Sequence, residues 1–475
     1  MSVWPKFPRP FRAQKDETIL RLTALVECQE AVIASLKIEA AKVGPLTAQV
    51  EMLTARVAEL EAKLGQPPKT PDNSSVPPSR GQKPSNPSKA KPKATPHAGA
   101  HRPLHPNPTT FRDLRTTHCP GCGCDVSNVE QYACEAYDRI EIPEIAPDVT
   151  RVTLHGGVCP CCRKRFKAVP PADIAPGSPF GPNLRAFVIF LRTIQNISLN
   201  RLVVVLECMF GLRISEGAIV NILDASRESF RTQTSLIKAR LLSGTALASD
   251  ETGVRVGKAN WWLWVFHNAM DAVFVADPHR TKEVVEGFLG GRRPDLWLSD
   301  RLGSQMGWAK IGHQVCLAHL IRDAQYVLDE GDIAFASGLI GLFKRACAIG
   351  RRRDRLAAST LKVYEADVER RLDRLLKMTP TTASGKKLMR AIKRFRQHLW
   401  VFMANGAVEP TNNGSERALR PAAVYRKVTN GFRAAWAATL YADTRSVVES
   451  GRRRGLSALE AIRLTLAGTP LPDPA

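Results

Sequence analysis

Three acidic residues stand where short apolar stretches end or a helix begins, and together they could hold metal ions. Residues 246–252 deliver Asp250 after an apolar run and a serine, and residues 295–300 repeat this design with Asp300. A third acid, Glu416, lies in a turn-rich segment that opens a helical stretch. Three convergent carboxylates suit Mg²⁺ or Mn²⁺, and two such ions can clamp the attacking and leaving oxygens of a phosphodiester.

A structural role for these acids stays open at this point, because Asp also caps helices and starts turns. The surrounding elements favour a shared site. Residues 261–266 and 272–277 are two further β-prone runs, so the first two acids lie in a sheet region. Residues 320–403 have helical periodicity and separate Asp300 from Glu416, which predicts a helical insertion. Its basic clusters, residues 351–353 and 386–396, are candidate DNA contacts.

A short segment ahead of this insertion carries a Cys-x-x-His pair. Residues 313–319 read as a strand entering a helix, with Cys316 and His319 near the junction. Such a pair can ligate metal. With so few ligand residues nearby, a structural or polar active-site role is the preferred interpretation.

The composition indicates a polyanionic partner. The chain has 475 residues, a formal net charge of +23 and a pI of about 9.9, which point to several domains and to nucleic acid. It has no run of eighteen apolar residues and no apolar signal core, so we expect neither a membrane span nor secretion. The eleven cysteines are clustered, which suits metal ligation in a reducing cytoplasm.

The N-terminal 64 residues resemble a leucine zipper. Two seams with alternating spacings of three and four contain Ile19, Leu22, Val26, Ile33, Leu36 and Val43, then Leu46, Val50, Leu53, Val57, Leu60 and Leu64. They predict a coiled coil and self-association, although a helix packed on its own protein would look similar. We expect a break or a stammer at Gly44-Pro45.

Residues 65–112 are rich in Pro, Ser and Lys, which predicts a disordered or extended basic linker. Its cations could touch phosphates without sequence preference, or the segment is a simple spacer. These cations are Lys83, Lys89, Lys91, Lys93 and Arg102.

Two Cys-x-x-Cys knuckles follow and predict a structural Zn²⁺ site of the ribbon type. The expected ligands are Cys119, Cys122, Cys159 and Cys162, and Cys124 and Cys161 could exchange with them. The long separation leaves room for an inserted hairpin around residues 132–154. Basic residues beside the second knuckle are candidate DNA contacts: Arg163, Lys164, Arg165 and Lys167.

Residues 181–240 have the pattern of a helix, a glycine-containing turn and a second, capped helix. The first helix begins near Ser198 and ends near Gly211, and Ser215 is the expected N-cap of the next. This order is typical of a helix-turn-helix, although any helical bundle produces it often.

Several motifs resemble those of bacterial DDE transposases of the insertion-sequence family numbered sixty-six. The matching pieces occur in the family's order: Asn73-Ser74-Ser75 with Pro77-Pro78-Ser79, the two cysteine knuckles, Asp250-Glu251-Thr252, Ser299-Asp300, Cys316-Leu317-Ala318-His319 and the long block 412–421. The resemblance implies that Asp250, Asp300 and Glu416 are the catalytic acids. Arg301 to Ser304 depart from the usual continuation, which leaves Asp295 and Glu251 as the nearest rivals and Asp271 and Asp277 as weaker ones.

The expected fold is multidomain α/β, and the resemblance implies its RNase H-like catalytic domain with the inserted helical subdomain. An N-terminal coiled coil (1–64) and the linker (65–112) precede a zinc ribbon (113–172), a helix-turn-helix region (173–240) and an RNase H-like catalytic domain (241–475) with a helical insertion at about 322–405.

The function implied is DNA cleavage and strand transfer at the ends of an insertion sequence, with two Mg²⁺ or Mn²⁺ ions. Arg417 and Arg420 would steady phosphates, or form a solvated helix face. Expected partners are double-stranded DNA, a second copy of the chain and accessory proteins of the same element, in the bacterial cytoplasm at the nucleoid. The alternatives are a non-catalytic DNA-binding protein, such as a regulator or a decayed transposase, and an RNase H-like structure-specific nuclease.

Overall fold

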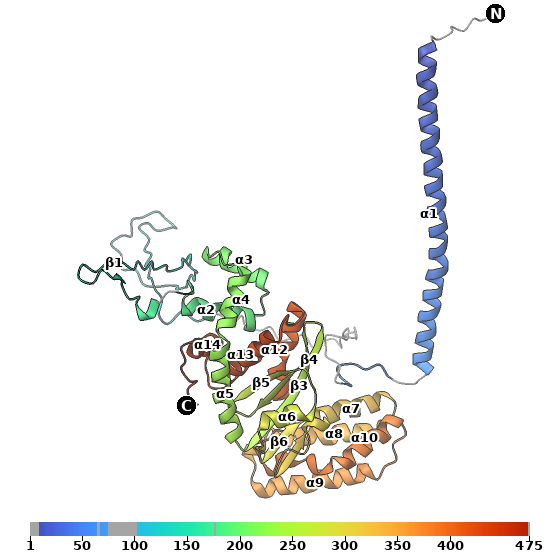
Figure 1. Cartoon of the computed structure of the whole chain (residues 1–475). Coiled ribbons are helices and arrows are strands. Elements are labelled where there is room, and N and C mark those ends of the chain that lie inside the picture. Colours follow the sequence, from blue (N-terminus) through green and yellow to red (C-terminus); the bar gives the residue numbers. More distant parts are fainter. Residues whose placement is uncertain (1–8, 64–66, 75–101, 175–176, 474–475) are drawn as a thin grey trace, which may run out of the picture.

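A single long helix stands apart from the rest of the molecule in the computed structural model (Figure 1). The structure describes residues 9–63, 67–74, 102–174 and 177–473. Helix α1 (Arg9–Lys63) is continuous, so the expected break at Pro45 is wrong. The proline removes one intrahelical hydrogen bond, and the flanking turns still propagate the helix. The seam residues from Ile19 to Val57 are 49–61% exposed, and self-association remains a prediction. Leu64 lies outside the described residues.

A short part of the predicted linker is docked on the α/β region. Within residues 67–74, Asn73 is only 4% exposed and donates a 2.8 Å hydrogen bond to Asp329. The same side chain accepts from the Thr70 N–H at 2.7 Å, which closes a turn. These residues therefore pack rather than stay extended. Lys83, Lys89, Lys91 and Lys93 lie outside the described residues.

The cysteine region (102–174) contains little regular structure. Strands β1 (Gly156–Val158) and β2 (Arg165–Lys167) form an antiparallel hairpin that carries the second knuckle. The first knuckle is a turn in which the Cys119 N–H donates to the Cys124 carbonyl at 2.9 Å. The hairpin expected around residues 132–154 is wrong, because no strand forms there. Its β-prone side chains have no surface to cover, and Tyr132 is 84% exposed.

Five helical segments follow and form a bundle against the sheet: α2 (Pro182–Ile189), the π-helix η2 (Phe190–Ile194), α3 (Leu199–Phe210), α4 (Glu216–Ala225) and α5 (Arg227–Ser243). The Ser198 and Ser215 side chains accept hydrogen bonds from the N–H groups of Arg201 and Ala218, so the predicted cap at Ser215 is confirmed and Ser198 caps the preceding helix as well. Gly211 makes the predicted turn with φ of 63°.

A five-stranded mixed sheet forms the centre of the molecule, in the order β5-β4-β3-β6-β7. The strands are β3 (Ala246–Val256), β4 (Ala259–His267), β5 (Ala272–Asp277), β6 (Leu296–Ser299) and β7 (Gly312–Val315). Strands β3, β4 and β5 are antiparallel neighbours, whereas β6 and β7 run parallel to β3. Helix α6 (Lys282–Leu289) and the 3-10 turn η3 (Gly303–Gln305) connect β5, β6 and β7.

Alternation along β3 sends neighbouring side chains into different cores. Leu247 packs with Trp297 and with the bundle α2–α5, whereas Ala248 packs with Leu298 and with the helices that follow β7. Val254 belongs to a third core, formed with the C-terminal helices. The sheet is therefore covered on both faces.

The segment between Asp300 and Glu416 is helical, as predicted (Figure 1). It contains α7 (Leu317–Asp329), α8 (Ile333–Gly350), η4 (Arg353–Arg355), α9 (Ala358–Leu376), α10 (Ala383–Arg394), η5 (Arg396–His398) and α11 (Val401–Ala404). Among the described residues, α8 alone has the length and apolar composition of a membrane span, but half of it is buried, as in a core helix.

Three C-terminal helices return to the sheet: α12 (Asn413–Thr429), α13 (Ala435–Arg453) and α14 (Ala458–Leu466). Helix α13 packs on β5, where the Ser446 and Ser450 hydroxyls accept hydrogen bonds from the Phe274 and Ala272 N–H groups. Buried Ala418 and Ala422 pack α12 into the core beside β3 and β4.

Candidate active site

Asp250 and Asp300 lie at equivalent places on two adjacent parallel strands. The last paired residues of β3 and β6 are Ala248 and Leu298, and each acid stands two residues further along. Ser249 and Ser299, which precede them, are fully buried. The Ser249 hydroxyl donates to Gln305 at 2.7 Å and accepts from the Trp297 indole at 2.9 Å. The predicted placement of two acids at one region of the sheet is therefore what the structure has.

Glu416 reaches this region because the start of α12 is fastened to β3. The buried Asn412 amide donates a 2.8 Å hydrogen bond to the carbonyl of Ser249, the residue before Asp250. The Asn412 N–H donates to the Cys316 sulfur at 3.1 Å, which ties the same loop to the junction of β7 and α7. Ser415 donates to Asn412 at 2.7 Å and lies 2.9 Å from His267 Nε2.

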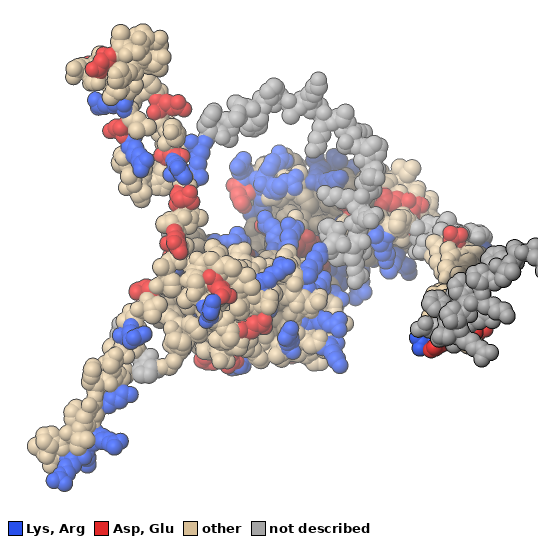
Figure 2. All heavy atoms as spheres, turned by 90° about the horizontal axis from the view of Figure 1, so that it is seen from above, with Lys and Arg blue, Asp and Glu red and all other residues tan. Residues whose placement is uncertain are grey.

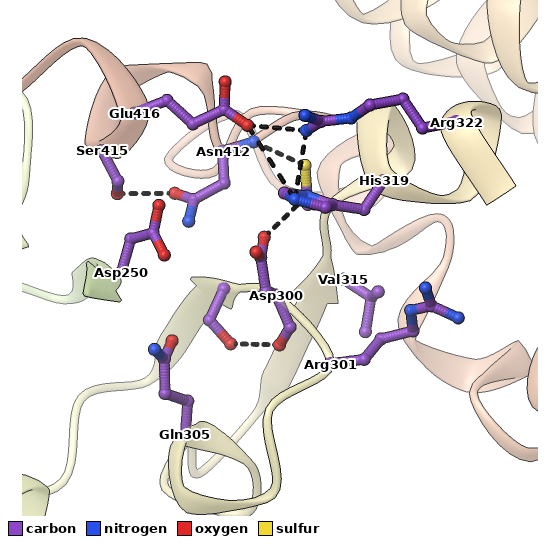
Figure 3. A network of polar contacts seen from close by, with 12 residues as sticks. Asp250, Asp300, Arg301, Gln305, Val315, His319, Arg322, Asn412, Ser415 and Glu416 are labelled. Atoms are coloured by element: carbon purple, nitrogen blue, oxygen red, sulfur yellow. Dashed lines mark hydrogen bonds and ion pairs between the residues drawn. The ribbon is translucent and has the colours of Figure 1, made fainter. Parts of the chain in front are cut away.

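A histidine and an arginine of α7 connect the second and third acids. His319 Nδ1 lies 2.9 Å from Asp300, and its Nε2 lies 4.0 Å from Glu416. Arg322 donates to Glu416 at 2.7 Å and lies 3.1 Å from His319 Nε2. Figure 3 shows the carboxylates of Asp250, Asp300 and Glu416 directed toward a common space beside the His319 ring.

We call Asp250, Asp300 and Glu416 the acid cluster, and the Cys316–His319 pair lies beside it. Ligand atoms of Asp300, Cys316 and His319 lie within 4.8 Å of one another, the one such group of three found among the described residues. The preferred sequence interpretation was a structural or polar active-site role for the pair. Sequence reasoning assigned nothing to Arg322, whose position one turn after His319 was the available signal.

The electrostatics of the cluster are those of crowded acids beside buried cations. Burial raises the pKa of Asp250 well above its usual range, and the charges of Asp300 and Glu251 raise it further. Burial alone would lower the pKa of His319, but hydrogen bonds and charges of Asp300 and Cys316 raise it to about 10. Negative charge therefore accumulates here, and cationic side chains partly balance it.

Each rival acid named from the sequence has another partner. Glu251 pairs with Arg280 at 2.6 Å and accepts from Gln305. Asp271 is buried against Arg454 and Arg240. Asp277 pairs with His279, and Asp295 lies 4.0 Å from Lys310. Each of the four rivals therefore has a basic partner in the structure.

Arg417 and Arg420 are exposed on α12 and, within the described part of the chain, make no hydrogen bond or ion pair. Arg417 lines a pocket with His267 and Glu449, and that lining does not include the three acids. The cation that holds Glu416 is Arg322. The two predicted phosphate contacts thus flank the cluster without touching it.

The four expected zinc ligands form two local knuckles. Backbone hydrogen bonding lowers the pKa of Cys122 and of Cys159, and neighbouring thiols within each knuckle add to the effect. No three of the described cysteine sulfurs lie within 4.8 Å of one another, so the two knuckles are not joined into one cluster. Arg163, Lys164 and Arg165 are exposed beside the second knuckle. The zinc site remains a prediction.

The fold and this cluster define a class of protein: a mixed α/β domain with partly buried carboxylates at the ends of neighbouring parallel strands and a large helical insertion. A family model described as Transposase IS66 family matches residues 177–440, from just before α2 into α13. The match covers more than half of the chain. The chain therefore belongs to the IS66 transposase family, and the resemblance noted from its motifs is confirmed. No curated protein matches the chain.

Proposed function

We propose that the protein is a DDE-type transposase that cuts DNA at the ends of an insertion sequence and joins those ends to target DNA. The observation that carries this proposal is the convergence of Asp250, Asp300 and Glu416 in a domain of a transposase family. The order of the sheet, three antiparallel strands followed by two parallel ones, supports the RNase H-like interpretation.

The residues at the cluster fit divalent metal ions. All three proposed ligands offer carboxylate oxygens, the donors that Mg²⁺ and Mn²⁺ prefer. Burial and neighbouring charges raise the pKa of Asp250, a cost that a cation would relieve. When bound, two such ions would activate the attacking oxygen and stabilise the departing one.

The proposed reaction has two balanced steps. In hydrolysis, a water oxygen bonds to the scissile phosphorus and the bond from phosphorus to the 3′-oxygen breaks, which leaves a 3′-hydroxyl and a 5′-phosphate. In strand transfer, that 3′-hydroxyl attacks a target phosphodiester and releases another 3′-hydroxyl. Neither step forms a bond to the protein, so no Ser or Tyr nucleophile is required.

Side chains around the acids would keep them in position. Asn412 fastens the start of α12 to the end of β3, which fixes Glu416 relative to Asp250. His319 and Arg322 connect the acids of β6 and α12 through α7. This arrangement leaves the orientation of the carboxylates dependent on buried hydrogen bonds, as a preorganised site requires.

The remaining modules would bind and pair DNA ends. The exposed seam of α1 supports pairing of two copies, so that both ends are cut together. The cysteine module with Arg163, Lys164 and Arg165, the helices α3 and α4, and Arg417 and Arg420 would contact DNA. Figure 2 shows Lys and Arg distributed over the globular part of the molecule, in keeping with the net charge of +23.

The test uses supercoiled plasmid DNA that carries the inverted repeats flanking this gene. We expect Asp250→Asn to abolish Mg²⁺- or Mn²⁺-dependent cleavage and leave end binding intact, because only the charge of one ligand is removed. Asp277→Asn, which alters an acid paired with His279, is the matched control and should cleave normally.

Cleavage by Asp250→Asn at the wild-type rate would refute the assignment of this acid. Binding of the ends without cleavage by the wild-type protein would instead favour a non-catalytic DNA-binding protein. Preferential cutting of branched DNA would favour a structure-specific nuclease.

A further inference from the structure

A second polar groove begins one residue beyond Asp300 and lies between the β7 edge and the helical insertion. It has a volume of about 1090 Å³ and is lined by Arg301, His313, Phe395, His398 and Trp400, among others. We call it the β7 groove. Figure 3 shows the Arg301 side chain directed away from the three acids, so this groove is separate from the acid cluster.

Two residues that line the groove each have a buried polar atom without a partner among the described residues. They are Nδ1 of His313 and Nε1 of Trp400, and both residues are only 4% exposed. An unpaired polar atom in such a place costs free energy, so a ligand that satisfies it gains correspondingly. These two atoms are therefore an indication of a ligand.

One of these two atoms is a hydrogen-bond acceptor and the other is a donor. The Ser299 hydroxyl donates its proton to the Asp300 carbonyl at 2.8 Å, so at 3.0 Å it accepts from His313 Nε2. Burial and the neighbouring His398 lower the pKa of His313 to about 3, so the ring is neutral. Nδ1 is then an acceptor, whereas Trp400 Nε1 is a donor. One donor and one acceptor complement the edge of a nucleobase.

Aromatic rings and a free arginine give the groove a surface on which a base can stack. Phe395 and His398 are partly exposed, and their ring centroids lie 6.4 Å apart. The Arg394 guanidinium lies 5.3 Å from the centroid of the Phe395 ring. Aromatic faces stack on any base, and arginine adds a cation–π contribution.

Helix α10 leads to this groove with a row of unpaired cations. Lys386, Lys387, Arg390, Lys393 and Arg394 are exposed, and none makes an ion pair or hydrogen bond within the described part of the chain. Positions 386, 390, 393 and 394 share one helix face, opposite the buried Leu388 and Ile392. We call these five residues the α10 stripe. Such a stripe complements a chain of phosphates.

We propose that the α10 stripe and the β7 groove together bind a single DNA strand, with phosphates along the stripe and an unstacked base in the groove. The inference deepens the proposed function and rests on it for the source of that strand, which would be separated from its partner beside the cleavage site. Paired bases present no free stacking face, so duplex DNA would not fill the groove.

The test measures binding in the Asp250→Asn protein without added Mg²⁺ or Mn²⁺, so that the DNA stays intact even if the acid assignment is wrong. The probes are a fluorescent single-stranded oligonucleotide of mixed sequence and its duplex, followed by fluorescence anisotropy over a range of salt concentrations. The variant Lys386→Ala/Arg390→Ala/Arg394→Ala removes three cations of the stripe. The matched control, Lys362→Ala/Arg374→Ala/Lys377→Ala, removes two exposed cations of α9 and the exposed lysine at its C-cap.

We expect the stripe variant to lower the slope of log affinity against log salt by about 2, because three phosphate contacts contribute about 0.7 each for a single strand. The α9 control should keep the slope. Phe395→Leu retains an apolar side chain but loses the stacking face, and should weaken single-strand binding roughly 5- to 150-fold with little effect on the duplex.

Equal losses in the stripe variant and the α9 control would overturn the proposal, since charge alone would then explain binding. Unchanged single-strand affinity in Phe395→Leu, with an unchanged melting temperature, would also overturn it. An equal loss of duplex and single-strand affinity would reject the assignment to an unpaired strand. If the cleavage test fails, these binding results can still be interpreted in the same way, because none of them requires catalysis.

Discussion

The acid cluster and the cysteine module assemble their ligand residues by different means. Asp250, Asp300 and Glu416 come from distant parts of the chain, and buried strands and hydrogen bonds bring them together. The cysteines lie in two short turns that stay apart, and the segment between the knuckles buries little. The comparison teaches that a hydrophobic core can place ligands in advance, whereas a small module without one depends on its metal.

The largest effect should come from removing zinc. We expect one Zn²⁺ per chain in the purified protein, and a strong chelator should make residues 102–174 sensitive to protease while residues 177–473 stay folded. Binding of structural zinc is worth about 10–16 kcal/mol in small modules, far more than this region gains from its own packing. Metal analysis and limited proteolysis with mass spectrometry check this.

Cys122→Ser should lose the zinc, and Cys208→Ser, which changes an exposed cysteine of α3, should retain it. If the protein purifies without zinc, or if the chelator leaves the proteolysis pattern unchanged, the cysteine module does not depend on zinc for its fold. The proposed difference between the two regions would then be wrong.

The second largest effect should be a loss of cleavage that leaves folding unchanged. Glu416→Gln keeps the size of the side chain and loses its charge, so we expect cleavage to fall by about 10³-fold or more while the unfolding free energy changes by about 1 kcal/mol or less. Plasmid cleavage and thermal melting measure the two quantities. Glu409→Gln, outside the cluster in the preceding loop, is the control. Residual cleavage above a tenth of the wild-type rate would show that Glu416 is not a ligand.

The smallest effect should come from a substitution that removes a hydrogen bond positioning the acids but leaves their charges in place. Asn412→Ala removes the hydrogen bond to Ser249 and the contact with Ser415, which should cost about 1–3 kcal/mol of stability. We expect cleavage to fall roughly 10- to 100-fold, because a small displacement of a positioned group has effects of that order.

Asn413→Ala changes the exposed neighbour and should leave both stability and cleavage close to wild type. If Asn412→Ala cleaves normally despite losing stability, the buried hydrogen bonds do not position the acids, and the contrast with the cysteine module is weaker.

Local patterns predicted much of the α/β region. The apolar runs before Asp250 and Asp300 became adjacent strands, and Ser215 became a helix cap, because these signals act over a few residues and agree with burial. The predictions that failed depended on what surrounds a segment. Pro45 does not break α1, and the β-prone residues around Tyr132 form no hairpin. The contact of Arg322 with Glu416 joins residues that are 94 positions apart, which no short-range pattern encodes.

The docked turn at Asn73 limits the length of chain that connects α1 to the rest of the fold. Asn73 lies ten positions after Lys63, the end of α1, so the span between them is at most about 35 Å. Should two α1 helices pair side by side, the two Asn73 anchors would lie no more than about 80 Å apart. The turn would then set an upper limit on the distance between two DNA ends that are cut together.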